Sequence, residues 1–119
     1  MFYKYNAKVL RVVDGDTLDL DVDLGFSVHV EIRLRLLNID TPETYGIKHD
    51  SEEYQRGLAA TAYTEYWVQQ NGANGVIVES YKGKTGKYGR WLGTVYSLDE
   101  SRILNEDLVS SGHAEVLTG

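Results

Sequence analysis

Residues 17–24 have the sequence TLDLDVDL, in which polar and apolar residues alternate without a break. Successive side chains of a β-strand point to opposite faces, so the leucines and the valine would share one face of a strand. Asp19, Asp21 and Asp23 would lie on the other face, which we expect to be solvated. The stretch therefore predicts a half-buried strand from which the rest of the fold can be placed.

Further strands are predicted on both sides of this stretch. Asp14-Gly15 is a hairpin signal that links it to an earlier strand over residues 5–13. Alternation resumes over residues 28–36, with valine, isoleucine and leucine on one face and histidine, glutamate and two arginines on the other. Pro42 cannot donate a ladder hydrogen bond, so this third strand should end just before it.

A helix is predicted after the third strand. Asp50 or Ser51 can cap it, apolar residues recur at every third or fourth position, and Asn71-Gly72 provides a stop. Its buried face is expected to carry Leu58 and the aromatic residues, which fit a core better than they fit base stacking. These aromatic residues are Tyr54, Tyr63, Tyr66 and Trp67.

Two more strands and a short second helix complete the pattern. Residues 75–81 and 88–97 have strand-like composition, and the KGKTGK stretch between them predicts a turn. Residues 104–109 predict a short helix that ends before Gly112. The chain is thus expected to be mainly β with helices (α+β), folded as one domain over residues 1–119. The architecture would be a five-stranded OB-fold barrel with a helix between strands 3 and 4 and a short C-terminal helix.

Composition excludes several kinds of chemistry. The 119 residues include no cysteine, which removes disulfides, thiolate nucleophiles and cysteine-held zinc. The three histidines are too scattered to suggest a metal motif. No apolar run approaches the roughly 20 residues that span a bilayer, so no membrane partner is expected. The N-terminus has no signal-peptide pattern, which predicts a cytoplasmic location unless a leader has been removed.

The charges of the chain are segregated along the sequence. The formal net charge is −6, which alone argues against a polyanionic partner, because phosphates are usually bound by Lys and Arg. Five aspartates lie within residues 14–23, whereas residues 82–90 carry three lysines and one arginine and no acid. Either run could simply be a solvated face.

Three segments could carry chemistry. VDGDT places Asp14 and Asp16 around a tight turn, IDTPE places Asp40 and Glu43 at a strand end, and KYGR places Arg90 at the start of a strand. Carboxylates from two turns suit a hard divalent cation, and arginines suit a phosphodiester. Acidic turns and arginines are also common on ordinary surfaces, so the residues alone leave both interpretations open.

All three segments resemble the signature motifs of the thermonuclease (staphylococcal nuclease-like) family, in the same order. The later segment LNEDLVSSGHAEV also resembles that family's LN-x-x-LV-x-x-G-x-A helix. The resemblance extends from about Lys8 to about Val116 and implies an OB-type barrel, a single Ca²⁺ site and endonuclease activity on DNA and RNA.

The resemblance also implies roles for individual residues. The Ca²⁺ ligands would be Asp16, Asp40 and the backbone carbonyl of Thr41. The catalytic residues would be Glu43, which activates water for in-line attack on phosphorus, and the phosphate-binding residues Arg35 and Arg90. Residues expected to contact the substrate are Lys84, Lys87 and Tyr88. Residues expected to support the metal-binding turn are Asp14 and Thr17.

Several alternatives remain open at this stage. Asp14 could be only the polar residue of the hairpin turn, and Arg33 shares a face with Arg35, although the motif spacing selects Arg35. Trp91 is expected to belong to the core, with stacking on a base as the alternative. An OB barrel can also bind single strands or protein tails without cutting, or keep calcium for stability alone. The acidic and arginine positions are all present, which favours an enzyme with a nucleic acid substrate, and we expect a monomer.

Overall fold

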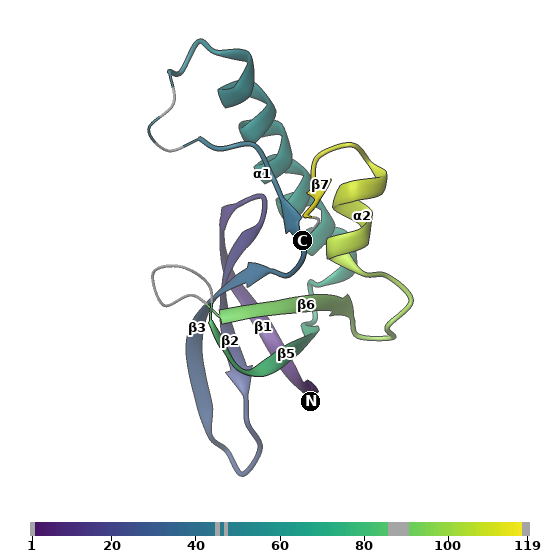
Figure 1. Cartoon of the computed structure of the whole chain (residues 1–119). Helices are drawn as coiled ribbons and strands as arrows, with labels where there is room; N and C mark the ends of the chain where they lie inside the picture. Colours follow the sequence, from purple (N-terminus) through teal and green to yellow (C-terminus); the bar gives the residue numbers. More distant parts are fainter. Residues whose placement is uncertain (1, 45, 47, 86–90, 118–119) are drawn as a thin grey trace.

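Five strands close into a barrel in the computed structural model of the chain, which describes residues 2–44, 46, 48–85 and 91–117 (Figure 1). Their order around the barrel is β1-β2-β3-β6-β5, and only the contact between β3 and β6 is parallel. The strands are β1 (Phe2–Asp14), β2 (Thr17–Asp23), β3 (His29–Leu36), β5 (Val76–Thr85) and β6 (Trp91–Ser97). This is the OB-type barrel that the sequence predicts.

Two helices lie at one end of the barrel (Figure 1). Helix α1 (Glu52–Asn71) connects the third and fourth barrel strands, and α2 (Leu104–Ser110) follows the fifth, as predicted. Ser51 caps α1, because its Oγ accepts a hydrogen bond from the Tyr54 N–H at 3.1 Å. Among the helices in the described part of the chain, none is both long and apolar enough to cross a membrane.

A small second sheet was not predicted. Strand β4 (Ile39–Asp40) pairs antiparallel with β7 (Glu115–Val116), next to a backbone hydrogen bond from Leu117 N–H to Asn38 O at 2.9 Å. Strands of two residues are too short to give a periodic pattern. The pairing fixes the IDTPE segment against the segment that follows α2.

The alternation in β2 and β3 gives the core face correctly near the helices and fails at the other end. Leu18, Leu20 and Leu34 are fully buried, whereas Val28 and Val30 on the same face are 51% and 40% exposed. The reason is the length of the hairpin, since β3 pairs with β6 only from Leu34 onward and its first half extends past the barrel.

The predicted buried face of α1 is wrong in part. Leu58 and Tyr66 are 43% and 59% exposed, while Trp67 is buried as expected and Tyr54 and Tyr63 are partly buried. The face that packs on the barrel is instead built mainly from small residues, which allow the helix to approach the backbone closely. It consists of Gly57, Ala60, Thr64 and Trp67.

The segment around the fifth barrel strand also differs from expectation. The KGKTGK turn was placed over residues 82–87, but β5 continues to Thr85 and residues 86–90 lie outside the described residues. Trp91 is 41% exposed, so its assignment to the core is wrong. The pairing of β5 with β6 is irregular in this segment, because the register shifts between Ser80 and Thr85.

Candidate active site

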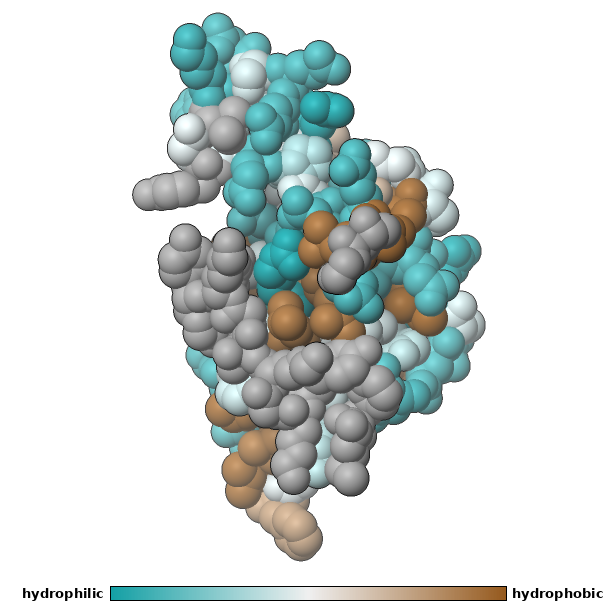
Figure 2. Space-filling model, in the orientation of Figure 1, coloured by the Kyte–Doolittle hydropathy of each residue, from teal (hydrophilic) through white to brown (hydrophobic). Residues whose placement is uncertain are grey.

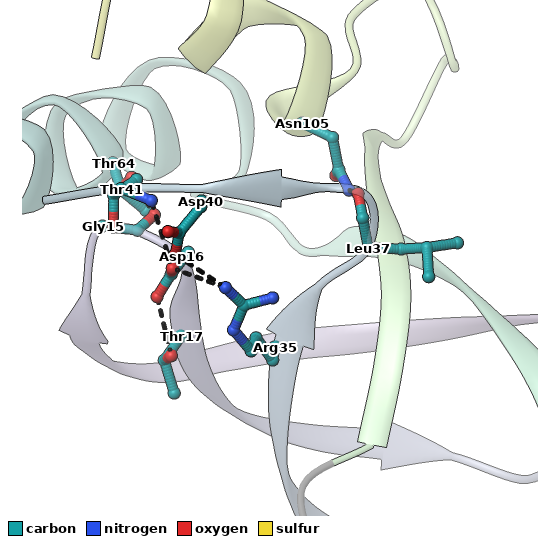
Figure 3. Close-up of polar contacts among 9 residues, drawn as sticks. All are labelled: Gly15, Asp16, Thr17, Arg35, Leu37, Asp40, Thr41, Thr64 and Asn105. Carbon is teal, nitrogen blue, oxygen red and sulfur yellow. Dashed lines mark hydrogen bonds and ion pairs between the residues drawn. The ribbon is translucent and has the colours of Figure 1, made fainter. Parts of the chain in front are cut away.

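Asp16 lies at the centre of a polar cluster between two turns that are distant in sequence (Figure 3). The residue is only 7% exposed. Its Oδ1 accepts a hydrogen bond from Thr17 Oγ1 at 3.0 Å, and its Oδ2 accepts one from the Thr41 N–H at 3.3 Å. The turn after β1 and the segment after β4 are therefore joined through one buried carboxylate.

Arg35 connects the two predicted metal ligands. Its Nη2 donates to Asp40 Oδ1 at 2.9 Å and lies 3.4 Å from Asp16 Oδ2 (Figure 3). Arg35 is four-fifths buried, whereas the Asp40 side chain is half exposed. The structure thus places Asp16, Asp40 and Arg35 at one point, with the open side at Asp40.

The alternative arginine is engaged elsewhere. Arg33 forms a two-pronged pair with Asp19 on the outer face of the hairpin, with Nε and Nη2 at 2.8 and 3.1 Å from the carboxylate oxygens. Arg35, which the motif spacing selects, is therefore the arginine that reaches the polar cluster.

Glu43 stands beside this cluster and is exposed to solvent. Partial burial of the carboxylate raises the pKa of Glu43, and the negative charges of Asp16, Asp14 and Asp40 raise it further, while Arg35 lowers it. A raised pKa brings the carboxylate closer to the pH at which it can exchange a proton with water.

Asp14 joins the same neighbourhood from β1. Its Oδ1 accepts a hydrogen bond from Thr44 Oγ1 at 3.2 Å, so it holds the segment that carries Glu43. The contact spans 30 positions in sequence. Asp14 is thus more than a turn residue in the structure.

Helix α1 sets the distance between the two turns. The Thr64 hydroxyl donates to Gly15 O at 2.7 Å, and a Cβ added at Gly15 would lie 2.9 Å from Ala60 Cβ. A Cβ added at Gly57 would lie 2.8 Å from Pro42 O and 2.9 Å from Glu43 O. Small residues on the helix are therefore required where it presses both acidic turns together.

Asn105 is a positioning residue whose role is not predicted from the sequence. Its side-chain amide donates to Leu37 O at 3.1 Å and to Gly93 O at 3.2 Å, and its Oδ1 accepts from the Val95 N–H at 3.1 Å. These bonds fix α2 to the junction of β3 and β6, just beyond Arg35 (Figure 3). The available signal was the polar residue inside the apolar LN-x-x-LV pattern.

Four predicted residues cannot be placed in this geometry. Lys87, Tyr88 and Arg90 lie outside the described residues, and Lys84 belongs to β5 at a position where only the strand is described. Their roles stay predictions.

The residues that are placed fit a hard divalent cation. Asp16 and Asp40 supply carboxylate oxygens near one nitrogen of Arg35, and the Thr41 segment contributes backbone. Asp14, Asp16 and Asp40 also lie close enough to Glu43 to raise its pKa. Ca²⁺ prefers oxygen ligands in a loose arrangement and accepts water in the remaining positions. Within the described ranges, no three acidic, histidine or cysteine side chains form a metal site by themselves, so carbonyl or water ligands would be needed.

A cleft of about 470 Å³ opens directly beside the cluster. Its lining includes Asp40 and Glu43 of the acidic segment, Arg56 of α1 and His113. A ligand bound at the cluster would therefore have solvent access along α1.

Comparison with known proteins assigns this arrangement of barrel and acidic turns to a family. The family described as "Staphylococcal nuclease homologue" matches residues 33–118. The chain is 34% identical over 106 residues to the thermonuclease of Staphylococcus intermedius, covering 89% of this chain and 56% of that protein. It is 33% identical over 113 residues to endonuclease YhcR of Bacillus subtilis, covering 93% of this chain and 9% of that protein.

A third relative is the uncharacterized protein MJ1439 of Methanocaldococcus jannaschii, 28% identical over 127 residues, with 94% of this chain and 59% of that protein covered. The chain thus spans less than two thirds of the length of each of these relatives. The family match covers most of the chain, and the chain belongs to the staphylococcal nuclease homologue family.

Proposed function

We propose that this chain is a Ca²⁺-dependent nuclease that hydrolyses phosphodiester bonds of DNA, RNA or both. The observation that carries the proposal is the convergence of Asp16 and Asp40 on one nitrogen of Arg35, with Glu43 beside them. Two relatives named thermonuclease and endonuclease support the same reaction class.

The metal would be held by Asp16, Asp40 and the backbone carbonyl of Thr41. When bound, Ca²⁺ supplies positive charge that polarises a phosphodiester oxygen. Asp16 is held from three directions by Thr17, Thr41 and Arg35, so its oxygens are oriented before any ligand arrives. Such support commonly strengthens metal affinity, because the ligand does not reorganise on binding.

Glu43 would accept a proton from the attacking water. Partial burial and the proximity of three other carboxylates raise its pKa and so its affinity for that proton, and its position at the surface gives water access. In-line attack on phosphorus then needs no covalent intermediate, which agrees with a chain that has no cysteine.

Arg35 would stabilise the charge that develops on the phosphoryl oxygens. Within the described residues, its hydrogen bonds all come from Nη2, so Nε and Nη1 remain available to a phosphate. A guanidinium offers two parallel donors to two oxygens, which a lysine cannot. Arg90 is predicted to share this role, and Lys84, Lys87 and Tyr88 are predicted to contact the substrate.

A cleavage assay tests the proposal. Denatured DNA is incubated with the chain in the presence of Ca²⁺ or of a chelator, and the products are separated by size. We expect cutting with Ca²⁺ and none with the chelator. DNA that is shifted but intact would indicate a binding module, and a melting temperature raised by Ca²⁺ without either effect would indicate a structural ion. Each of these two outcomes would overturn the proposal.

A further inference from the structure

The first half of β3 has an open edge. The strand pairs with β2 along its whole length, from His29 to Arg35, but with β6 only from Leu34 to Leu36. In the described part of the chain, no strand pairs with residues 29–33 on the side away from β2. Figure 1 shows this half of the β2–β3 hairpin extending from the barrel at the end opposite α1.

Three hydrogen bonds show which backbone groups lie on that edge. Leu36 N–H donates to Asp16 O and Leu24 N–H donates to Val28 O, both at 2.8 Å. Even-numbered residues of β3 therefore bond toward β2. Leu37 N–H donates to Gly93 O in β6 at 2.8 Å, so odd-numbered residues point the other way. By this alternation, the N–H and C=O groups of His29, Glu31 and Arg33 point outward.

The side chains along this edge are apolar on one face. Val28 and Val30 are 51% and 40% exposed, and Ile32 beside them is partly buried against the core. Figure 2 shows hydrophobic residues at the lower end of the molecule, where this hairpin lies. An edge strand with free backbone groups and an exposed apolar face is suited to pairing with another strand.

We propose that two copies of this chain pair through this edge, antiparallel, into one continuous sheet, in contrast to the monomer expected from the sequence. His29 of one copy would lie opposite Glu31 of the second copy, and Val30 would lie opposite Val30. Val28 would then face Ile32 of the second copy. The pairing places a histidine beside a glutamate on the polar face and three apolar pairs on the other.

Charge and geometry select this register over its neighbours. If the centre of the pairing is moved by one residue toward the C-terminal end of β3, Glu31 of each copy lies opposite Glu31 of the other. Like charges directly opposite each other are unfavourable. Moving the centre by two residues places Glu31 opposite Arg33, whose guanidinium is already held by Asp19. It also places Val30 opposite Leu34, which already pairs with β6. Moving the centre by one residue in the opposite direction places His29 opposite His29. It would also require Ser27 to pair as a strand residue, although its positive φ of 63° is outside strand geometry.

The charges on the outer face of the hairpin also favour this register. Glu31 lies directly opposite Asp21 in β2, a pair of like charges, while His29 contacts Asp21 at 3.2 Å. A second copy would bring another His29 next to Glu31. The charge pattern is therefore complementary to itself in this register and would repel an acidic strand.

A first experiment measures mass against concentration. Sedimentation or light scattering from about 10 μM to about 1 mM should show the mass rising from 13.4 kDa toward twice that value. Glu31→Pro removes an outward N–H and leaves the bonds to β2 intact, so this variant should stay monomeric with its melting temperature nearly unchanged. Glu31→Gln keeps the donor and should still associate.

A second experiment tests the register and does not depend on the proline variant. The chain has no cysteine, so single cysteines give a clean background. Val30→Cys should form a disulfide dimer on mild oxidation, because its counterpart would be about 4.5 Å away between Cα atoms. Val28→Cys, on the same face and at least as exposed, should not, because it would face Ile32.

Three results would overturn the proposal. They are a mass that stays at 13.4 kDa at every concentration, association that persists in Glu31→Pro, and equal cross-linking of the two cysteine variants. None of these readouts involves nucleic acid cleavage, so the proposal stands or fails separately from the nuclease function.

Discussion

The two ends of the β2–β3 hairpin have the same alternating sequence and opposite environments. Near the helices, Leu20 and Leu34 are fully buried and Arg35 is held within the polar cluster. At the far end, Leu24 continues the alternation and is 43% exposed, and Phe26 in the turn is fully exposed. Alternation therefore determines which face a residue occupies, and the neighbouring elements determine whether that face is covered. The candidate site lies at the covered end of the hairpin, where α1 and β6 enclose the strands.

The largest expected effect is on activity at the enclosed end. Arg35→Lys should lower the rate of DNA cleavage by about 10²–10³, because a lysine cannot donate to two phosphoryl oxygens at once. Arg33→Lys, on the same strand but paired with Asp19, is the matched control and should retain most of the rate. Equal losses in both variants, measured as initial rates at saturating Ca²⁺, would mean that activity does not depend on the place of Arg35 in the polar cluster.

Glu43→Gln should lower the rate without loss of stability. The substitution removes the proposed base, and it also removes one negative charge from a group of four carboxylates. We therefore expect a rate loss on the order of 10² or more, with a free energy of unfolding that does not fall. A clear drop in that free energy, measured by urea unfolding, would show that the carboxylate supports the fold instead.

Two leucine-to-alanine substitutions in and just after β2 compare the two ends of the hairpin by their effect on the free energy of unfolding. Leu20→Ala should cost about 2–5 kcal/mol, because it leaves a cavity in the core. Leu24→Ala, four residues further on the same face, should cost less than about 1 kcal/mol, because the side chain is already half in water. Similar costs in urea unfolding would show that the far end is as well packed as the barrel.

Gly57→Ala tests how α1 closes the enclosed end. Alanine is the better helix former, but its Cβ would press on Pro42 O and Glu43 O. We expect a net loss of about 1–3 kcal/mol together with lower activity, because the segment that carries Glu43 must move. Leu58→Ala, exposed on the same helix, serves as the control. An unchanged or higher stability in Gly57→Ala would contradict the close packing.

The smallest expected effect is a change in the pH dependence of stability, and it concerns Asp99, in a turn outside the β2–β3 hairpin. Hydrogen bonds from the Ser101 hydroxyl, the Ser101 N–H and the Ser97 hydroxyl lower the pKa of Asp99 to about 2, from an ordinary value of 3.8. Its stabilising contribution is complete above pH 3.8 and is lost as the pH falls toward 2. Asp99→Asn should therefore lose slightly less stability than the parent over that range, as measured by urea unfolding at both pH values.

Much of the fold could be predicted because local rules decide it. The alternation in TLDLDVDL, the Ser51 cap and the stop at Asn71-Gly72 each have a local physical cause, and the structure agrees. The buried face of α1 was missed because Gly57 and Thr64 carry no apolar signal, and only the approach of the two turns makes them core residues.

In the candidate site, too, some residues could be predicted from the sequence and others depend on how distant elements pack. Motif resemblance brought Asp16, Arg35 and Asp40 together, and the structure places them in contact. The supporting bonds of Asn105 and Thr64 could not be predicted, because each joins backbone far away in sequence and depends on the packing of a helix.

Cleavage rate as a function of Ca²⁺ concentration, in the parent chain and in Asp40→Asn, tests the central claim most directly. If the two turns jointly hold the metal, Asp40→Asn should require at least about tenfold more Ca²⁺ for half-maximal rate, because one charged ligand is lost. Glu43→Gln should instead lower the maximum without that shift. An identical Ca²⁺ requirement in the parent and Asp40→Asn, or cleavage that needs no divalent ion, would contradict the account.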